Sequence, residues 1–568
     1  MPTSRLLRRL FPFLSWSRPT PGLLRGEFSA GLTIGLMVIP QGVAYAALAG
    51  MPLITGIYAS LLPALVAVLW GSSTRLSVGP TALTCLLVAS SLTGMAEPGS
   101  PEWINLAMWL ALLSGLLQIA LGWLSFGWLV SVVSSPVLMA FTQAAAILIL
   151  LSQVPALLGY SGGLATLWEA PGSMNVLTAG FGLVSLALML AAKRWVPRLP
   201  TVVIIVIGAS LASTLLNVEG HGGEVVGVLQ SGMPTLQLPT LLPWSTLSSL
   251  VLPVLVITLV SFLETAASAK IDSQDAGRRW NQNQDLLGQG LAKVSSALCG
   301  AFPTSSSFSR SALNLYAGAR TGWATIFSVV VVLAVLLFGM GLLRPVPKSV
   351  LAAVVVAATY GLLKPAGFRN LWRLTRVEAV IAGITFMVTL VSAPRLYWGV
   401  LVGLTLSLLH FLYHRLHPRI IEVGLHADGS LRDRWLWQLP ALAPGLLALR
   451  MDAGLEFSSS GAFERFVTDH LADRPDIKHV ALFAQSINRI DATGIECLIR
   501  LLSSLASQGR ELHLVGMKRP VENMLEKAQG VSSHPALHVY RTDAFALQAL
   551  GVGTGPSPAH ESEKQEKP

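Results

Sequence analysis

Residues 300–318 read GAFPTSSSFSRSALNLYAG, and they place a permanent cation, Arg310, among serine hydroxyls in an otherwise apolar part of the chain. A proline precedes the polar run, and the apolar run that follows is too short to cross a bilayer as a helix. Residues 71–92, GSSTRLSVGPTALTCLLVASSL, show the same order about 230 residues earlier, with Gly79-Pro80 before the short apolar run. Short segments interrupted by Gly or Pro at corresponding places of two halves indicate a transporter built from inverted repeats.

The composition indicates that most of the chain lies in lipid. Only 12% of the 568 residues are charged, half of the roughly 25% typical of soluble domains, and the mean hydropathy is +0.62. Apolar runs such as residues 106–124 and 326–343 are each about long enough to span a bilayer as a helix. Such runs recur from Phe28 to Tyr413, about a dozen to fourteen in all. We therefore expect a polytopic α-helical membrane protein.

The net charge of +10 follows the positive-inside pattern rather than that of a nucleic-acid-binding protein. Basic residues gather before the first span, in three loops and after the last span, whereas the long segment 217–249 has none. They are Arg5, Arg8, Arg9, Arg18, Arg25, Lys193, Arg194, Arg198, Lys270, Arg278, Arg279, Lys364, Arg369, Arg373, Arg376, Arg415 and Arg419. With these loops inside, both termini are cytoplasmic, and we expect a multi-pass protein of the cell inner (plasma) membrane.

The two short segments predict an anion site in mid-membrane. A helix that begins there leaves its first amide groups unpaired and its positive dipole end exposed, and two such ends that face each other attract an anion. Arg310 adds a full charge, at a cost of about 2.5–3.5 kcal/mol for an arginine inside the membrane, which a bound oxyanion offsets. The alternative is that Arg310 holds helices together by pairing with a carboxylate, for which Glu264 is the plausible partner.

Three further polar side chains lie in apolar runs. Glu264 is the single acid in the span VLPVLVITLVSFLETAASAKI, where it suits proton uptake and release, or else a helix-to-helix contact. Gln41 lies between Pro40 and Gly42, which indicates a broken helix; Gln41 either binds a ligand or satisfies the freed backbone. Tyr45 lies one turn later on the same face and is either a site residue or a packing residue.

The chain changes character after the apolar region. From 441 to 552, strand runs alternate with amphipathic helices, which predicts a small sheet covered by helices. The expected organisation is an N-terminal cytoplasmic arm (1–25), a membrane domain (26–415, with repeats at 26–218 and 250–415), a linker (416–440), an α/β domain (441–552) and a disordered tail (553–568).

Together these segments resemble the SulP family of anion transporters. The resemblance rests on AGLTIGLMVIPQGVAYAALAG near the start, SSPVLMAFTQAAAILILLSQVPALLG in the middle, and SFLETAASAK with NQNQDLLGQGLAKVSSALCGAFPTSSSFSRSALNLYAGAR, and it covers residues 12 to 550. HVALFAQSINRIDATGIECLIRLL is similar to the STAS domain that follows the membrane part in this family. The resemblance implies a 7+7 inverted repeat of about 14 segments with two short half-helices, divided into a moving core and a gate subdomain, a cytoplasmic STAS domain, and a homodimer.

The resemblance also implies which residues bind the anion, between the third and tenth segments. They are Gln41, Tyr45, Gly79, Pro80, Thr81, Phe308, Ser309, Arg310 and Ser311. Glu264 matches the acidic position associated with cation coupling, and glutamate there favours a proton over sodium. Lys293 departs from the family pattern, which often has asparagine at this place. The serine-rich run favours sulfate by proton symport, while bicarbonate, a dicarboxylate such as fumarate or succinate, or uncoupled exchange or channel activity remain open.

In the STAS domain, Thr493 of the DATG motif matches the position of the serine that is phosphorylated in anti-sigma-factor antagonists. A phosphate there would be stabilised by a helix N-terminus, and a cytoplasmic regulator would be the partner. The alternative is that Asp491 and Thr493 only cap the helix.

Other functional classes have less support in the sequence. It contains no P-loop, metal-ligand motif or nucleophile arrangement, so we expect neither an enzyme nor a cofactor or metal. The three cysteines are far apart and suggest packing residues rather than a disulfide framework. A membrane-anchored regulator would need neither Arg310 and Glu264 nor two broken segments.

Overall fold

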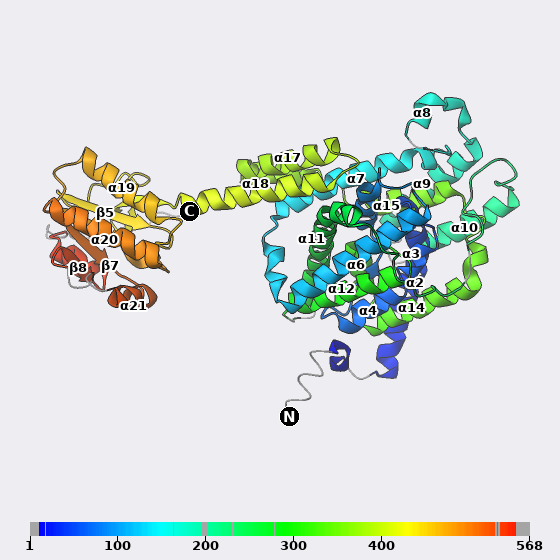
Figure 1. Cartoon of the computed structure of the whole chain (residues 1–568), viewed down its shortest axis with the longest axis horizontal. Coiled ribbons are helices and arrows are strands. Elements are labelled where there is room, and N and C mark those ends of the chain that lie inside the picture. The colour runs from blue at the N-terminus through cyan, green and yellow to red at the C-terminus, as the bar shows by residue number, and fades with distance from the viewer. Residues whose placement is uncertain are drawn as a thin grey trace, which may run out of the picture. The chain divides into compact units, whose positions relative to one another are not determined.

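The computed structural model describes residues 11–552 except 17–18, 163, 196–200, 230–231, 276, 278, 529–530 and 532–533. The chain divides after Ser407 into two compact units, one helical and one that contains a mixed sheet with helices (Figure 1). The first ten residues of the expected N-terminal arm and the expected tail at 553–568 lie outside the described residues.

The first half of the helical unit contains seven helical segments among the described residues, with α3 and α4 counted as one. They are α2 (Pro21–Leu48), α3 (Thr55–Tyr58) with α4 (Leu62–Trp70), α5 (Ala82–Leu92), α6 (Pro101–Trp123), α7 (Ser135–Leu157), α9 (Val176–Trp195) and α10 (Thr201–Leu215). The first helix begins at Pro21 because the Thr20 hydroxyl accepts a hydrogen bond from the Leu23 amide and proline suits the first helical turn. The short helix α8 (Thr166–Glu169) lies in the connection before α9.

The second half repeats the order of long and short segments. It contains α11 (Trp244–Asp275), α12 (Gln282–Leu298), α13 (Phe308–Tyr316), α14 (Trp323–Ala334) with a distorted continuation to Leu342, α15 (Lys348–Tyr360), α17 (Arg376–Val391) and α18 (Tyr397–Leu416), with the amphipathic α16 (Ala366–Leu374) before α17. Six of the described helices are long and apolar enough to cross a membrane alone: α2, α6, α7, α11, α14 with its continuation, and α18. The predicted 7+7 helical fold is confirmed.

The helices α5 and α13 are the two predicted half-helices. They have 11 and 9 residues, so at about 1.5 Å per residue each covers only about half of a bilayer core of roughly 30 Å. Each follows a two-residue strand, β1 (Val78–Gly79) and β2 (Ser305–Ser306), and these strands pair antiparallel, with Val78 opposite Ser306 and Gly79 opposite Ser305. The pairing fixes the two helix beginnings beside each other.

The helices around this point pack closely. Helix α6 contacts α12 over much of its length, and α2 contacts α14 in the same way. A Cβ at Gly115 of α6 would lie 2.8 Å from the carbonyl oxygen of Gly290 in α12, and a Cβ at Gly290 would lie 2.7 Å from that of Gly115. Both positions therefore require glycine, because any side chain would push the two helices apart.

The second unit is built on a six-stranded sheet with the order β4-β3-β5-β6-β7-β8. The strands are β3 (Ile420–Leu425), β4 (Leu431–Asp433), β5 (Leu446–Met451), β6 (His479–Phe483), β7 (Glu511–Val515) and β8 (Leu537–Tyr540); β5 to β8 run parallel, and β3 and β4 are antiparallel. The helices are α19 (Ser460–Asp473), α20 (Ala492–Ser507), α21 (Arg519–Lys527) and α22 (Asp543–Ala549). A core of Leu447, Leu449, Val480, Leu482, Phe463 and Leu498 joins α19 and α20 to the sheet.

The structure differs from the expected linker at 416–440, because this segment contains β3 and β4. Their connection is a tight turn in which the Asp428 carboxylate accepts hydrogen bonds from the amide and hydroxyl of Ser430, and Gly429 has φ +80°. An Asp-Gly pair between short extended runs is a hairpin signal. The sheet therefore begins before residue 441, with β3 at Ile420. The hairpin signal was overlooked because the residues around the turn are polar.

Candidate functional site

Two helix N-termini meet at the strand pair β1–β2. Helix α5 is capped by Thr81, whose Oγ1 accepts a hydrogen bond from the Thr84 amide at 3.3 Å. Helix α13 is capped by Ser307, whose Oγ accepts from the Arg310 amide at 3.5 Å. Because both positive dipole ends point to one place, the electrostatic field there favours negative charge.

Arg310 lies at this meeting point and is almost fully buried, with 1% of its surface exposed. Its Nε donates a hydrogen bond to Ser77 Oγ at 3.2 Å, and its Nη1 donates to Gln41 Oε1 at 3.4 Å. The third nitrogen, Nη2, is buried and has no hydrogen-bond partner among the described residues. No carboxylate in this described part of the chain lies within ion-pair distance of Arg310. The guanidinium is thus held by neutral groups, with one strong donor unused.

Gly79 leaves room beside that unused donor. An ideal Cβ at Gly79 would lie 3.5 Å from Arg310 Nη2 and 3.6 Å from Ser60 Oγ. Pro80 follows it and provides no backbone N–H, and Thr81 then caps α5. The residues of this turn are buried. A side chain at position 79 would therefore occupy the space next to the guanidinium.

The remaining predicted site residues are distributed around this point. Gln41 and Tyr45 are buried on α2, which continues through Pro40 as one helix and is not broken there as expected. Gln41 contacts Arg310. Ser311 is buried, and its hydroxyl accepts a hydrogen bond from the Ser77 amide at 3.0 Å, so it holds β1 in place. Phe308 is 46% exposed, and Ser309, also exposed, has its hydroxyl 3.4 Å from that of Ser307.

Ser77 is a residue that sequence reasoning missed. It contacts the site twice, because its hydroxyl accepts from Arg310 and its amide donates to Ser311. Its carbonyl oxygen accepts from the Ser307 amide at 2.9 Å. Its position two residues before Gly79, in a polar stretch, could have indicated from the sequence that it is a site residue.

Glu264 of α11 is tied to the beginning of α5. Its Oε2 lies 3.2 Å from Thr81 Oγ1 and 3.3 Å from Thr84 Oγ1, and both hydroxyls can donate to it. A carboxylate beside a helix N-terminus is stabilised by the helix dipole. Any change in the charge of Glu264 therefore acts on the first turn of α5, which also carries Gly79 and Pro80 at its entrance.

Lys293 of α12 is a second buried cation in the described helical unit, with 0% of its surface exposed. Its Nζ donates hydrogen bonds to Gln118 Oε1 at 2.8 Å and to Ser261 Oγ at 2.7 Å. Ser261 lies one helical turn before Glu264 on α11. The sequence analysis noted Lys293 only because the family often has asparagine there. A single charged residue in the run GQGLAKVSSALCG could itself have indicated a functional position.

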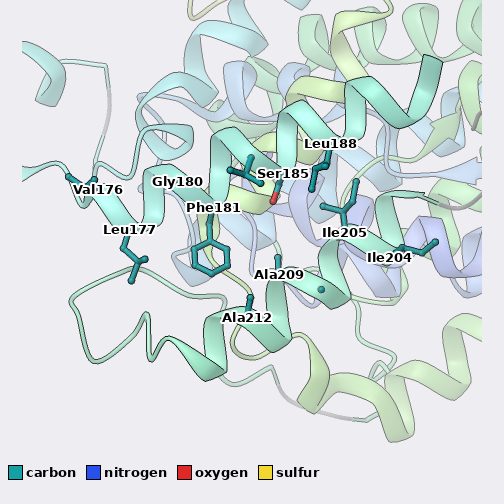
Figure 2. A pocket seen from close by; sticks show the side chains of 12 residues that line it. Val176, Leu177, Gly180, Phe181, Ser185, Leu188, Ile204, Ile205, Ala209 and Ala212 are labelled. Carbon is teal, nitrogen blue, oxygen red and sulfur yellow. The ribbon is translucent and has the colours of Figure 1, made fainter. Parts of the chain in front are cut away.

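The cavities of the helical unit differ in chemistry. One cavity, of about 860 Å³, lies between α9 and α10, and its lining is apolar except for Ser185 (Figure 2), which does not suit an anion. A polar cavity of about 270 Å³ is lined by residues that include Ser72, Ser73 and the buried ion pair of Arg75 with Asp272. A small cavity shares Arg75 and Asp272 with it and reaches Phe308 and Ser311.

In the second unit, Thr493 lies in the first turn of α20 and is half-buried. The helix is capped by Asp491, whose carboxylate accepts a hydrogen bond from the Gly494 amide at 2.9 Å and another from the Phe457 amide at 2.9 Å. The Thr493 hydroxyl is in none of these bonds, so Asp491 alone accounts for the cap.

Comparisons with known proteins agree with this architecture. Residues 24–385 match the model of the sulfate permease family, and residues 441–545 match that of the STAS domain. A probable sulfate transporter of Mycobacterium tuberculosis is 30% identical over 536 residues, which cover 93% of this chain and 95% of the relative. The chloroplastic sulfate transporter 4.1 of Arabidopsis thaliana is 30% identical over 552 residues, which cover 90% and 78% of the two chains.

Two solved structures have the same fold. The murine Solute Carrier 26 family member A9 anion transporter, in its inward-facing state, aligns with a TM-score of 0.85 at 21% identity and covers 96% of this chain and 95% of its own. The transmembrane domain of the cyanobacterial bicarbonate transporter BicA aligns with a TM-score of 0.58 at 20% identity, over 69% of this chain and 98% of its own. At these identities, both likenesses show the shared fold only.

Proposed function

The chain belongs to the sulfate permease family. We propose that it carries an inorganic oxyanion, with sulfate as the leading candidate, across the cell inner membrane by proton symport. In this proposal the anion binds between the beginnings of α5 and α13, and alternating access exposes that place to one side and then to the other. The protein works as a homodimer with both termini in the cytoplasm, where a regulator acts on the STAS domain.

The main support for the proposal is the buried Arg310 at the meeting of two helix ends, whose Nη2 has no hydrogen-bond partner within the described part of the chain. A guanidinium that already donates to Ser77 and Gln41 is held in one orientation, so an arriving oxyanion finds an oriented donor. A charged hydrogen bond of this kind is worth about 1.5–3 kcal/mol. The glycine at position 79 places no side chain beside that donor.

Glu264 is the proposed proton carrier, because it contacts the cap of α5 through Thr81 and Thr84. A proton on Glu264 would remove a negative charge close to the helix end at which the anion binds. Anion and proton would then favour each other in the same state, which is the requirement for symport.

Lys293 favours a second candidate function, uncoupled anion exchange. Its buried Nζ donates to Ser261, which lies one helical turn before Glu264 on α11. A protonated Lys293 would balance the Glu264 carboxylate without a proton on that carboxylate, and the anion would then cross without coupling.

Transport by purified protein in liposomes tests the proposal. We expect an inward proton gradient to drive concentrative sulfate uptake by the wild type. Arg310→Ala should abolish uptake and weaken sulfate binding roughly ten- to a hundredfold, measured as lost thermal stabilisation by sulfate in detergent. Arg344→Ala, which removes an exposed arginine of the same unit, is the matched control. Sulfate stabilisation that persists in Arg310→Ala would refute the site assignment.

The same liposomes separate the substrates and the coupling. Competition by bicarbonate, fumarate or succinate against labelled sulfate ranks the anions. Uptake that requires an anion inside the liposomes and ignores the proton gradient would favour the exchanger over the symporter.

A further inference from the structure

A cluster of three histidines and a glutamate lies on one face of the sheet in the STAS unit. His479 is on β6, Glu511 and His513 are on β7, and His538 is on β8. The register places His479 opposite Glu511 and His513 opposite His538. Since side chains alternate along a strand, these four lie on the face opposite Val480, Leu512 and Leu514, which belong to the core under α19 and α20.

The ligand atoms of three of these residues converge. The distances are 3.1 Å between His479 Nδ1 and His513 Nε2, 3.3 Å between His479 Nδ1 and Glu511 Oε2, and 3.8 Å between His513 Nε2 and Glu511 Oε2. Ligand atoms around a tetrahedral zinc ion, at metal–ligand distances of about 2.0–2.2 Å, are about 3.3–3.6 Å apart. The three atoms therefore already have nearly the spacing of one face of a zinc coordination tetrahedron.

His538 lies beside the open fourth position. Its Nε2 is 3.2 Å from Glu511 Oε2, yet it is buried without a hydrogen-bond partner among the described residues. Its ring stacks on that of His513, with the centroids 5.0 Å apart. A nitrogen so close to a carboxylate oxygen, without the geometry of a hydrogen bond, fits a lone pair directed at a shared ion.

The surroundings of His513 disfavour its protonated form. His513 has 4% of its side chain exposed, and burial, together with the neighbouring His538 and His479, lowers its pKa to about 4. It is therefore neutral at pH 7, and a neutral imidazole has a lone pair for a metal. His479 and Glu511 are about 40% exposed, which leaves a path from solvent.

We propose that His479, Glu511 and His513 bind a zinc ion, with His538 at the edge of the fourth position. The ion would join β6 to β7 and restrain the β8 edge on the face of the sheet that α19 and α20 do not cover. The sequence predicted no metal site, because Glu511 and His513 lie two residues apart on β7, whereas His479 is 32 residues before Glu511 and His538 is 25 residues after His513, and these spacings match no zinc motif. Parallel pairing of β6, β7 and β8 brings them together.

Zinc content of the full-length protein, purified without a histidine tag, tests this proposal. After equilibration with Zn²⁺ and removal of free metal, we expect one zinc per chain in the wild type by mass spectrometry. His479→Gln and Glu511→Gln should each lower zinc affinity at least about tenfold. Both side chains are partly exposed, so these substitutions spare the core. His470→Gln removes a histidine of α19 outside the cluster and should retain the zinc.

Cobalt provides an independent readout of the geometry. Co²⁺ in place of zinc should show the intense visible absorption of a tetrahedral site in the wild type and in His470→Gln, and lose it in His479→Gln. A wild type that holds no more zinc than His479→Gln, or a cobalt spectrum typical of octahedral coordination, would overturn the proposal. Neither measurement depends on transport, so the result stands apart from the proposed function.

Discussion

The guanidinium of Arg310, on the short helix α13, donates from Nη1 to Gln41 Oε1 on α2 at 3.4 Å. The two residues are 269 positions apart in the chain. Since the amide oxygen is neutral, it orients the cation without cancelling its charge. The guanidinium therefore keeps its charge for a ligand, with Nη2 unpartnered among the residues that the structure describes, and Gln41 becomes a control point for the proposed anion site.

Gln41→Glu should therefore be more harmful than Gln41→Ala. The glutamate would form a buried ion pair with Arg310 and compete with any anion for the guanidinium, so we expect sulfate affinity to fall roughly ten- to a hundredfold. Gln41→Ala removes one neutral hydrogen bond and should cost only a fewfold. Thermal shift with increasing sulfate, in detergent, measures both. Equal losses in the two variants would mean that Gln41 acts by packing and not through charge.

The half-helices were predictable because Gly79-Pro80 and Pro303 interrupt apolar runs within the local sequence. The partners of Arg310 were harder to predict, since Ser77 is 233 positions away and reaches it only through the two-residue pairing of β1 with β2. The same limit applies to Lys293 and Gln118, which are 175 positions apart. No local pattern encodes contacts that depend on how two repeats interlock.

In the second unit, too, local sequence patterns predicted some elements, whereas contacts between distant residues could not be predicted. Alternating strand and helix runs predicted its parallel part, while β3 and β4 were missed because an Asp-Gly turn in a polar setting resembled a linker. The histidine cluster arises from register alone: a shift of β6 against β7 by one residue would move His479 to the other face of the sheet.

Removing the proposed metal should loosen one edge of the sheet. In full-length protein treated with a chelator, we expect faster amide hydrogen exchange in β6, β7 and β8 than in the zinc-loaded protein, because the ion no longer joins the strands. Readdition of Zn²⁺ should restore protection in the wild type but not in His479→Gln. Exchange in β3 and β5, whose strands carry none of the four residues, is the internal reference. Uniform changes across the whole sheet would contradict a local site.

Thr493→Glu should alter the transport rate without altering the order of preferred anions. The substitution places negative charge in the first turn of α20, where the helix dipole stabilises it, and in a unit separate from the one that holds Arg310. Thr468→Glu adds the same charge at an exposed position of α19 and is the matched control. Initial uptake rates in liposomes measure the effect. If Thr493→Glu leaves the rate unchanged, Thr493 has no regulatory role and is only a structural residue of the first turn of α20, which Asp491 caps.

Glu264→Gln should separate anion binding from proton coupling. The amide keeps an oxygen that can accept from Thr81 and Thr84, so α5 should stay in place, but it cannot take up or release a proton near neutral pH. We expect an inward proton gradient to stop driving concentrative uptake, while sulfate binding at Arg310 and exchange persist. The wild type should be faster at acid pH, where the carboxyl is protonated alongside the bound anion, and the variant nearly flat with pH. Glu224→Gln, at an exposed ion pair with Lys348, is the control and should keep the wild-type pH response. If proton-driven accumulation survives in Glu264→Gln, the carboxyl has only a structural role at the cap of α5.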